Sequence, residues 1–132
     1  MQTLEHFEHV GSRGIYRPVG VVTFEQAVDL LVLAMQHARS LGLTELLVNA
    51  QGLSGFSSPG TFSRYSMAVR SAESGGGALR LAIVVEAGLI DPQKIGVVMA
   101  QNRGLDTDVF PSESEAIRWL DLRSASRRRP SP

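Results

Sequence analysis

Strand-like apolar runs alternate with helix-like segments along this chain, and that alternation is the feature that most restricts its fold. Strands are expected over Leu4–Val10, Ile15–Val22, Glu45–Ala50, Leu79–Ala87 and Val109–Phe110, and helices over 24–41, 59–72, 91–104 and from 112 onward. A short link with a glycine at each end joins the first two strands, which is typical of a β-hairpin. The order β-β-α-β-α-β-α-β-α predicts one α/β domain with four helices and a mixed, mainly parallel sheet of about five strands.

Local signals indicate where the helices begin and which faces they bury. Thr23 with Gln26, and Ser112 with Glu115, have the three-residue spacing of a capping box. Asp91 is followed by proline, the residue that best fits the first turn of a helix. The apolar residues expected to face the sheet are Phe62, Tyr65 and Val69 on the second helix and Ile95, Val98 and Met99 on the third.

The composition is typical of a soluble globular domain, with 43% apolar and 20% charged residues. No apolar run approaches the ~18 residues of a membrane span, and the N-terminus lacks the apolar core of a secretory signal, so we expect a cytoplasmic protein. The absence of cysteine excludes disulfides, thiolate chemistry and cysteine-ligated zinc. His6 and His9 lie on opposite faces of the first predicted strand, and His37 lies on a helix, so we expect no metal site.

Charge is distributed unevenly, although the formal net charge is zero. Residues 1–120 hold nine basic and twelve acidic side chains, whereas residues 121–132 hold four arginines and one aspartate. The acidic body argues against a nucleic-acid-binding domain. Residues 123–132 are expected to form a disordered basic Ser/Arg/Pro tail after a domain that spans residues 1–122. A solubilising role for this tail is favoured over contact with nucleic acid or an acidic membrane.

The residues do not assemble a catalytic pattern. Gly52-Leu53-Ser54 begins like the nucleophile elbow of a serine hydrolase, but Phe56 stands where that motif needs a second glycine. All three histidines precede Ser54, and the carboxylates are scattered singly apart from Asp106 and Asp108. We interpret those two acids as charges that protect an edge strand. We therefore expect no enzyme activity and no cofactor.

The candidate functional site is the loop between the strand at 45–50 and the second helix. An apolar run, Leu46–Val48, enters a Gly/Ser-rich turn, and Ser58 followed by Pro59 has the pattern of a helix N-terminus. Such a helix end favours a negative charge, either a bound anion or a phosphorylated serine. The residues expected to bind a partner here are Asn49, Gln51, Ser54, Phe56, Ser57, Ser58 and Gly60.

Two segments resemble the STAS domain, the fold of the anti-sigma factor antagonists. In that family a strand ends in an Asp-Ser-Ser-Gly loop and a helix follows at once, which is similar to the run here through Ser57-Ser58-Pro59-Gly60 to Arg64-Tyr65. The closing segment, VFPSESEAIRWL at 109–120, is similar to the end of the bacterial SpoIIAA-like or STAS-like group, with Phe, a short acidic stretch and Ala-x-x-Trp-Leu. The resemblance covers residues 4–122.

The resemblance implies a non-enzymatic, regulatory protein-binding module. In the antagonists a kinase-like anti-sigma factor phosphorylates the loop serine, and the added charge switches partner binding. By position that serine is Ser57, with Ser58 beside it. The chain departs from the family pattern, because Phe56 replaces the acidic residue and Pro59 precedes Gly60. The alternative is that Ser58 is only a helix N-cap and Ser57 only a loop residue.

Two further interpretations stay open. A small-molecule or lipid-binding domain of related fold would place Phe56, Phe62 and Met67 around an enclosed apolar cavity beneath the loop, although aromatic residues at helical spacing are more often core. Val32 and Leu33 project onto the polar side of the first helix. We expect these two residues either to form a homodimer or partner surface, or to be covered by a neighbouring loop.

Overall fold

The structure, a computed structural model, describes residues 4–57 and 60–128, and for residues 61, 62 and 125–128 it describes only the backbone. The predicted site residue Ser58, the side chain of Phe62 and the end of the predicted tail, residues 129–132, lie outside the described part. None of the helices in the described ranges combines the length and the apolar character needed to cross a membrane.

Five strands form the main sheet, namely β1 (Phe7–Val10), β2 (Arg13–Tyr16), β4 (Glu45–Asn49), β6 (Arg80–Val84) and β7 (Asp106–Phe110). They lie in the order β1-β2-β4-β6-β7, with β1 antiparallel to β2 and the other pairs parallel. The described helices are α1 (Phe24–Ser40), α2 (Thr61–Gly75), α3 (Ile95–Asn102) and α4 (Glu113–Arg128), with a short 3-10 turn, η1 (Ala87–Leu89). The predicted α/β fold, with its mainly parallel sheet and four helices, is confirmed.

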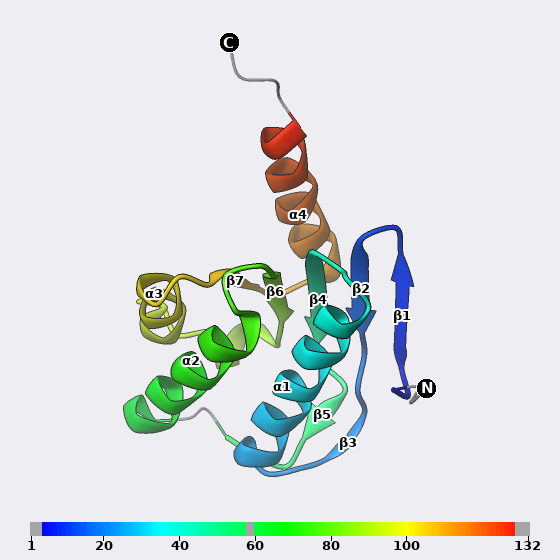
Figure 1. Ribbon diagram of the computed structural model, residues 1–132. Coiled ribbons are helices and arrows are strands. Elements are labelled where there is room, and N and C mark those ends of the chain that lie inside the picture. Colours follow the sequence, from blue (N-terminus) through cyan, green and yellow to red (C-terminus); the bar gives the residue numbers. More distant parts are fainter. Residues whose placement is uncertain (1–3, 58–59, 129–132) are drawn as a thin grey trace.

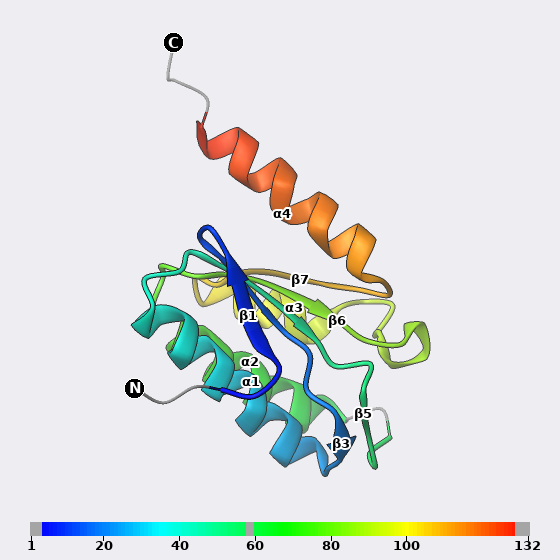
Figure 2. The same cartoon turned by 90° about the vertical axis from the view of Figure 1, so that its right-hand side faces the viewer.

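The helices cover the two faces of the sheet unequally. α1, α2 and α3 lie against one face, and α4 lies against the other (Figure 1, Figure 2). Alternate residues of a strand point to opposite faces. Leu46 and Leu81 therefore join the larger core under α1–α3, whereas Leu47 and Val84 join a smaller core with Leu120 of α4. The second face depends on a single helix of the described chain.

A second, two-stranded sheet was not expected. β3 (Gly20–Val21) pairs in parallel with β5 (Leu53–Ser54). The prediction of one continuous strand over Ile15–Val22 is wrong, because β2 ends before Pro18, which has no N–H to donate to a ladder. The two segments approach closely at Gly52, where an added Cβ would lie 2.8 Å from the Pro18 carbonyl oxygen. Because glycine has no side chain, the two segments can approach each other this closely.

At both predicted capping boxes the Thr or Ser side chain accepts the expected backbone hydrogen bond. At α1, Thr23 Oγ1 accepts from the Gln26 N–H at 3.1 Å, and Gln26 Oε1 accepts from the Thr23 N–H at 2.9 Å. At α4, Ser112 Oγ accepts from the Glu115 N–H at 3.3 Å. There the Ser112 hydroxyl, rather than its N–H, meets the Glu115 carboxylate at 3.0 Å, so only the α1 box is fully reciprocal.

The third helix begins later than predicted. α3 starts at Ile95, and its N-cap Lys94 has a left-handed backbone conformation with φ +50°. Asp91 still caps the helix from four residues upstream, because its carboxylate accepts from the Ile95 N–H at 2.9 Å. The chain between β6 and α3 is therefore a long connection, and the Asp91–Ile95 hydrogen bond holds its end against the start of α3.

α4 extends beyond the predicted end of the domain. It continues to Arg128, so the first part of the predicted disordered tail is helical. Arg123 donates to Asp106 at 3.0 Å, and Ser124 donates to Glu45. These contacts with the sheet stabilise a helix where composition alone predicts a flexible tail.

A charged ladder crosses the amino ends of four strands. The register pairs Arg13 with Glu45, Glu45 with Arg80 and Arg80 with Asp106, so positive and negative side chains alternate. Arg80 donates to Glu45 at 2.8 Å and to Asp106 at 3.0 Å, and Arg13 donates to Glu45 at 3.1 Å. The Arg80 and Glu45 side chains are 4% and 6% exposed, so the centre of this ion-pair network is buried.

Candidate functional site

The start of the predicted loop is anchored to the rest of the domain. It leaves the carboxyl end of β4, the edge of a parallel sheet where α/β domains commonly bind ligands. Asn49 Nδ2 donates to Glu113 Oε2 at 2.6 Å, and Asn49 Oδ1 accepts from the Gln51 N–H at 2.9 Å. Gln51 Nε2 donates to the Pro111 carbonyl oxygen at 2.8 Å. Asn49 and Gln51, which we expected to contact a partner, hold the loop on the β7–α4 junction.

The anchor at Glu113 is ionic. Arg17 donates to the Glu113 carboxylate through Nε at 2.8 Å and Nη2 at 3.0 Å, which is a bidentate pair. This hydrogen bonding lowers the pKa of Glu113, although partial burial acts in the opposite direction, and it raises the pKa of Arg17. Glu113 therefore stays ionised at neutral pH and continues to accept from Asn49.

The tip of the loop has one inward aromatic residue and several outward polar ones. Phe56 is half-buried and packs edge-on against Phe24 of α1, with ring centroids 5.9 Å apart. Ser54, Ser57 and Gly60 are exposed. Of the predicted partner-binding residues that the structure describes, Gln51 is exposed as well, although its side-chain amide is hydrogen-bonded to the Pro111 carbonyl oxygen.

The N-terminus of α2 is displaced from its predicted position. The helix begins at Thr61, and Gly60 has the extended backbone of an N-cap residue, with φ −74° and ψ 176°. The interpretation of Ser58 as the N-cap is therefore wrong. Glycine supplies no side-chain acceptor, and the first turn holds no acidic residue. The positive end of this helix dipole is not neutralised by its own first turn.

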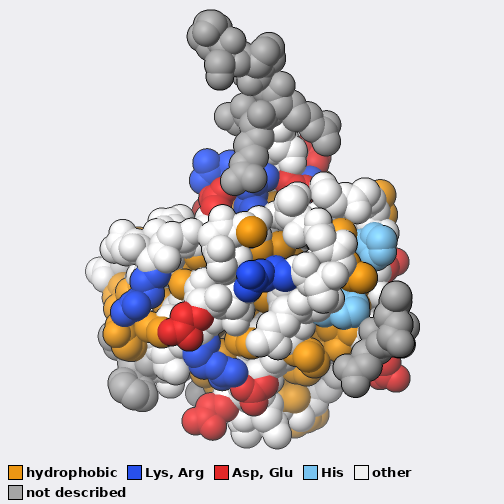
Figure 3. All heavy atoms as spheres, in the orientation of Figure 1, with side chains coloured by type: hydrophobic (Ala, Val, Ile, Leu, Met, Phe, Trp, Pro, Cys, Tyr) orange, Lys and Arg blue, Asp and Glu red, His pale blue; other side chains and the backbone are white. Residues whose placement is uncertain are grey.

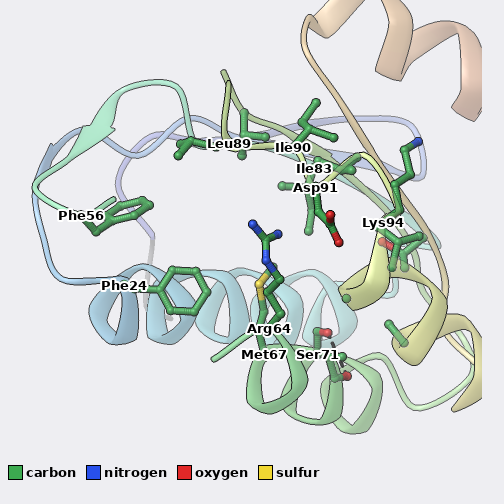
Figure 4. A pocket seen from close by; sticks show the side chains of 17 residues that line it. Phe24, Phe56, Arg64, Met67, Ser71, Ile83, Leu89, Ile90, Asp91 and Lys94 are labelled. Atoms are coloured by element: carbon green, nitrogen blue, oxygen red, sulfur yellow. Dashed lines mark hydrogen bonds between the residues drawn. The ribbon is translucent and has the colours of Figure 1, made fainter. Parts of the chain in front are cut away.

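A partly open cavity of about 130 Å³ lies beside the loop, between α2, α3 and the β6–β7 part of the sheet (Figure 4). Its wall is mainly apolar, and the side chains that define it include Phe24, Phe56, Met67, Ile83, Val97 and Val109. Phe56 and Met67 are two of the residues expected around such a cavity. The β6–α3 connection closes one side of the cavity with Leu89 and Ile90. This connection was not part of the site predicted from the sequence.

Small side chains explain why this space is not filled. Ala68 and Ser71 line the cavity from α2, and Gly96 and Ala100 line it from α3. Protein interiors are close-packed, so longer side chains at these positions would occupy the space. Small residues on two consecutive helices were visible in the sequence, but nothing in the sequence showed that the two groups meet.

Charged side chains gather at one end of the cavity. Asp91 accepts from the Ile95 N–H, and this hydrogen bond is the main cause that lowers the pKa of Asp91, with a further contribution from the charge of Arg64. Lys94 Nζ donates to Asp108 Oδ1 at 2.8 Å. The Arg64 side chain extends from α2 between the two phenyl rings and Asp91 (Figure 4). The cavity thus combines an apolar wall with a charged end.

Other predicted features lie apart from this cavity. Leu33 on α1 is 46% exposed and Val32 is half-buried, and their role in a homodimer stays a prediction. Within residues 4–57 and 60–128, no group of three His, Cys, Asp or Glu side chains is placed to hold a metal ion. On the face drawn in Figure 3, basic and acidic side chains are interspersed.

The anchored loop and the apolar cavity share one residue, Phe56, and so form one continuous candidate site. The cavity offers hydrocarbon surface and fixed charges. Its Ser71 hydroxyl already donates to the Ala68 carbonyl oxygen at 3.2 Å. The STAS-like resemblance stays a prediction, because no model of a known protein family matches this chain and no curated protein matches it either.

Proposed function

We propose that this protein is a non-enzymatic binding module that holds a small, mainly apolar molecule in the cavity between α2, α3 and the sheet. The observation that carries the proposal is the cavity itself, about 130 Å³ in volume and lined mainly by aliphatic and aromatic side chains. An apolar space of ~150 Å³ is enough to hold benzene. Its position toward the carboxyl ends of parallel strands is also where α/β domains most often bind ligands.

Toluene is a suitable probe, because it is apolar and close to the cavity in size. In ¹H–¹⁵N NMR spectra, toluene is expected to shift the amide signals of Ala68, Ser71 and Ala100 in a saturable way, since all three line the cavity. Val97→Phe puts a ring into the same space and should weaken toluene binding at least about tenfold.

Val98→Phe is the matched control. Val98 is the next residue of α3, is 46% exposed and does not line the cavity, so toluene should bind this variant as it binds the original protein. Shifts that do not saturate, or that are equally large in a folded Val97→Phe variant, contradict the proposal.

A second candidate is a regulatory protein-binding function switched by phosphorylation of Ser57. Two observations favour it. Ser57 is exposed in the loop, and the nearby α2 N-terminus has a glycine cap and no acidic residue in its first turn. A phosphate at a helix N-terminus is stabilised by the helix dipole and the first-turn N–H groups. The partner that the STAS-like resemblance suggests is a kinase-like anti-sigma factor.

Mass spectrometry on protein isolated under mild conditions from its own cells tests this candidate. A phosphate on Ser57 is expected, together with a co-purifying kinase-like protein. Ser57→Asp should then change the affinity for that protein about tenfold, whereas Ser66→Asp, at an exposed position of α2 outside the loop, should leave it unchanged. An unmodified Ser57, and a Ser57→Asp variant that binds normally, would remove the switch.

A further inference from the structure

Thr107 brings a buried hydroxyl group to the wall of the mainly apolar cavity. Thr107 is 3% exposed and lines the cavity from β7. In the part of the chain that the structure describes, no group hydrogen-bonds to this hydroxyl, although the Thr107 carbonyl oxygen accepts from Gln101 at 3.0 Å. We infer that the bound molecule is a small uncharged ring compound whose hydroxyl group hydrogen-bonds to Thr107. This inference rests on the proposed small-molecule function and specifies the chemical class of the ligand.

A buried hydroxyl without a partner is unusual in a folded protein. Most buried side-chain polar atoms are hydrogen-bonded, because taking such a group out of water without a new partner costs free energy. Among the described residues, every fully buried side-chain nitrogen or oxygen atom has a hydrogen bond. Thr107 Oγ1 has none, so it is not fully enclosed, and Thr107 lines the cavity. The hydroxyl is therefore within reach of a molecule inside the cavity.

The surroundings of Thr107 place it beside the end of α3. The hydrogen bond from Gln101 Nε2 to the Thr107 carbonyl oxygen joins β7 to the last turn of that helix. Ala100, the neighbour of Gln101, also lines the cavity. Since Ala100 contributes only a methyl group, it leaves room for a ligand atom next to the Thr107 hydroxyl.

Ser71 adds a second buried hydroxyl to the same wall, from α2 (Figure 4). Ser71 is 3% exposed and donates to the Ala68 carbonyl oxygen at 3.2 Å. Its proton is therefore in use, and its oxygen can only accept a further hydrogen bond, whereas the Thr107 hydroxyl can donate and accept. A ligand hydroxyl, itself both donor and acceptor, matches these two groups better than a carbonyl oxygen, which can only accept.

The volume of the cavity sets the size of the ligand. About 130 Å³ is close to the ~150 Å³ that holds benzene. It is well below the ~300–1,000 Å³ of pockets that enclose drug-sized ligands. A single aromatic ring with one small substituent therefore fits, whereas a complete lipid does not.

The apolar wall suits an aromatic ring. Phe24 and Phe56 meet at an interplanar angle of 69°, the edge-to-face arrangement that aromatic pairs favour, and a third ring can join them in the same way. Met67 adds a polarisable thioether, which makes favourable contacts with aromatic rings. Packing therefore recognises the ring, and Thr107 recognises its substituent.

The charged side chains around the cavity favour an uncharged ligand. Lys94 is paired with Asp108, and Arg64 and Asp91 carry opposite charges on the same side of the cavity (Figure 4). A charged ligand would lose its hydration in this mainly apolar space, and these balanced charges would not compensate for the loss.

Phenol and toluene form the decisive pair of probes, because a hydroxyl group replaces a methyl group on the same ring. Phenol is uncharged at neutral pH, since a phenolic hydroxyl has a pKa of about 10. Both are titrated into the full chain, and dissociation constants are taken from the amide shifts of Ala68 and Ala100. Phenol is expected to bind at least as tightly as toluene, although it loses more hydration on entering the cavity.

Substitutions at Thr107 assign the binding of phenol to its hydroxyl. Thr107→Val replaces that hydroxyl with a methyl group of similar size, and should weaken phenol binding at least about tenfold while toluene binds no less tightly. Thr107→Ser keeps a hydroxyl and should retain phenol binding. Thr44→Val is the control, because Thr44 is exposed and does not line the cavity.

The outcomes separate this inference from the proposed function. If toluene binds, but phenol binds the original protein no more tightly than folded Thr107→Val, the hydroxyl inference is refuted and the small-molecule function stands. Equal effects of Thr107→Val and Thr44→Val on phenol also refute the role of Thr107. A Thr107→Val variant that does not fold would show that the hydroxyl has an essential partner within the protein, which contradicts the inference. If neither probe binds the folded protein, the inference and the proposed function both fail.

Discussion

Replacing Arg80 with methionine is expected to lower the free energy of unfolding by about 3–5 kcal/mol, the usual cost of removing one partner from a buried ion pair. The Arg80 side chain lies between Glu45 and Asp106 and is 4% exposed. Methionine keeps much of the volume but leaves the buried Glu45 carboxylate with less compensating charge. Equilibrium urea denaturation at neutral pH measures the change.

Two comparisons make this prediction specific to the buried network. Arg70→Met removes an exposed pair with Asp29 and should cost less than about 1 kcal/mol. Combining Arg80→Met with Glu45→Met should recover part of the loss, because the buried carboxylate that has lost the charge of Arg80 is removed as well. An Arg80→Met variant that is no less stable than Arg70→Met would show that the network contributes nothing measurable.

The ion-pair partners of Arg80 could not be predicted from the sequence. The strand around Arg80 was predicted from its apolar run, but its two acidic partners lie 35 and 26 residues away. Only the strand order and register bring the four charges into one row. Local patterns contain no information about that register, so Asp106 was interpreted merely as a charge that protects an edge strand.

The main sheet and the helices could be predicted because each has enough residues to show a period. β3 and β5 could not, since two-residue strands have no period, and they form through the close approach at Gly52. The inward faces of the helices were predicted only in part. Tyr65 and Val98 were expected to pack on the sheet, yet they are 44% and 46% exposed.

The candidate site stays a prediction, and the sequence indicated only some of the residues that surround it. The order of strand, loop and helix identified the loop, and Phe56 and Met67 do line the adjoining cavity. Asn49 and Gln51 were expected to bind a partner, whereas their side-chain amides are hydrogen-bonded to the Glu113 carboxylate and the Pro111 carbonyl oxygen. A cavity is unfilled volume between several elements, so it has no signature in any one of them.

The dependence of one sheet face on α4 leads to the second large expected effect. Leu47, Ala82 and Val84 form this face, and Ala116 and Leu120 of α4 complete its core. The opposite face is covered by three helices (Figure 2). Loss of packing under α4 therefore has no neighbouring helix to compensate for it.

Leu120→Ala is accordingly expected to lower the free energy of unfolding by about 2–5 kcal/mol, through the lost burial and the cavity that remains. Leu122→Ala is the matched control: it makes the same change two residues further along α4, where the side chain is 65% exposed, and should alter stability by less than about 0.5 kcal/mol. Urea denaturation of both variants measures the difference. Equal losses would mean that α4 does not pack on the sheet through Leu120, which is 0% exposed in the structure.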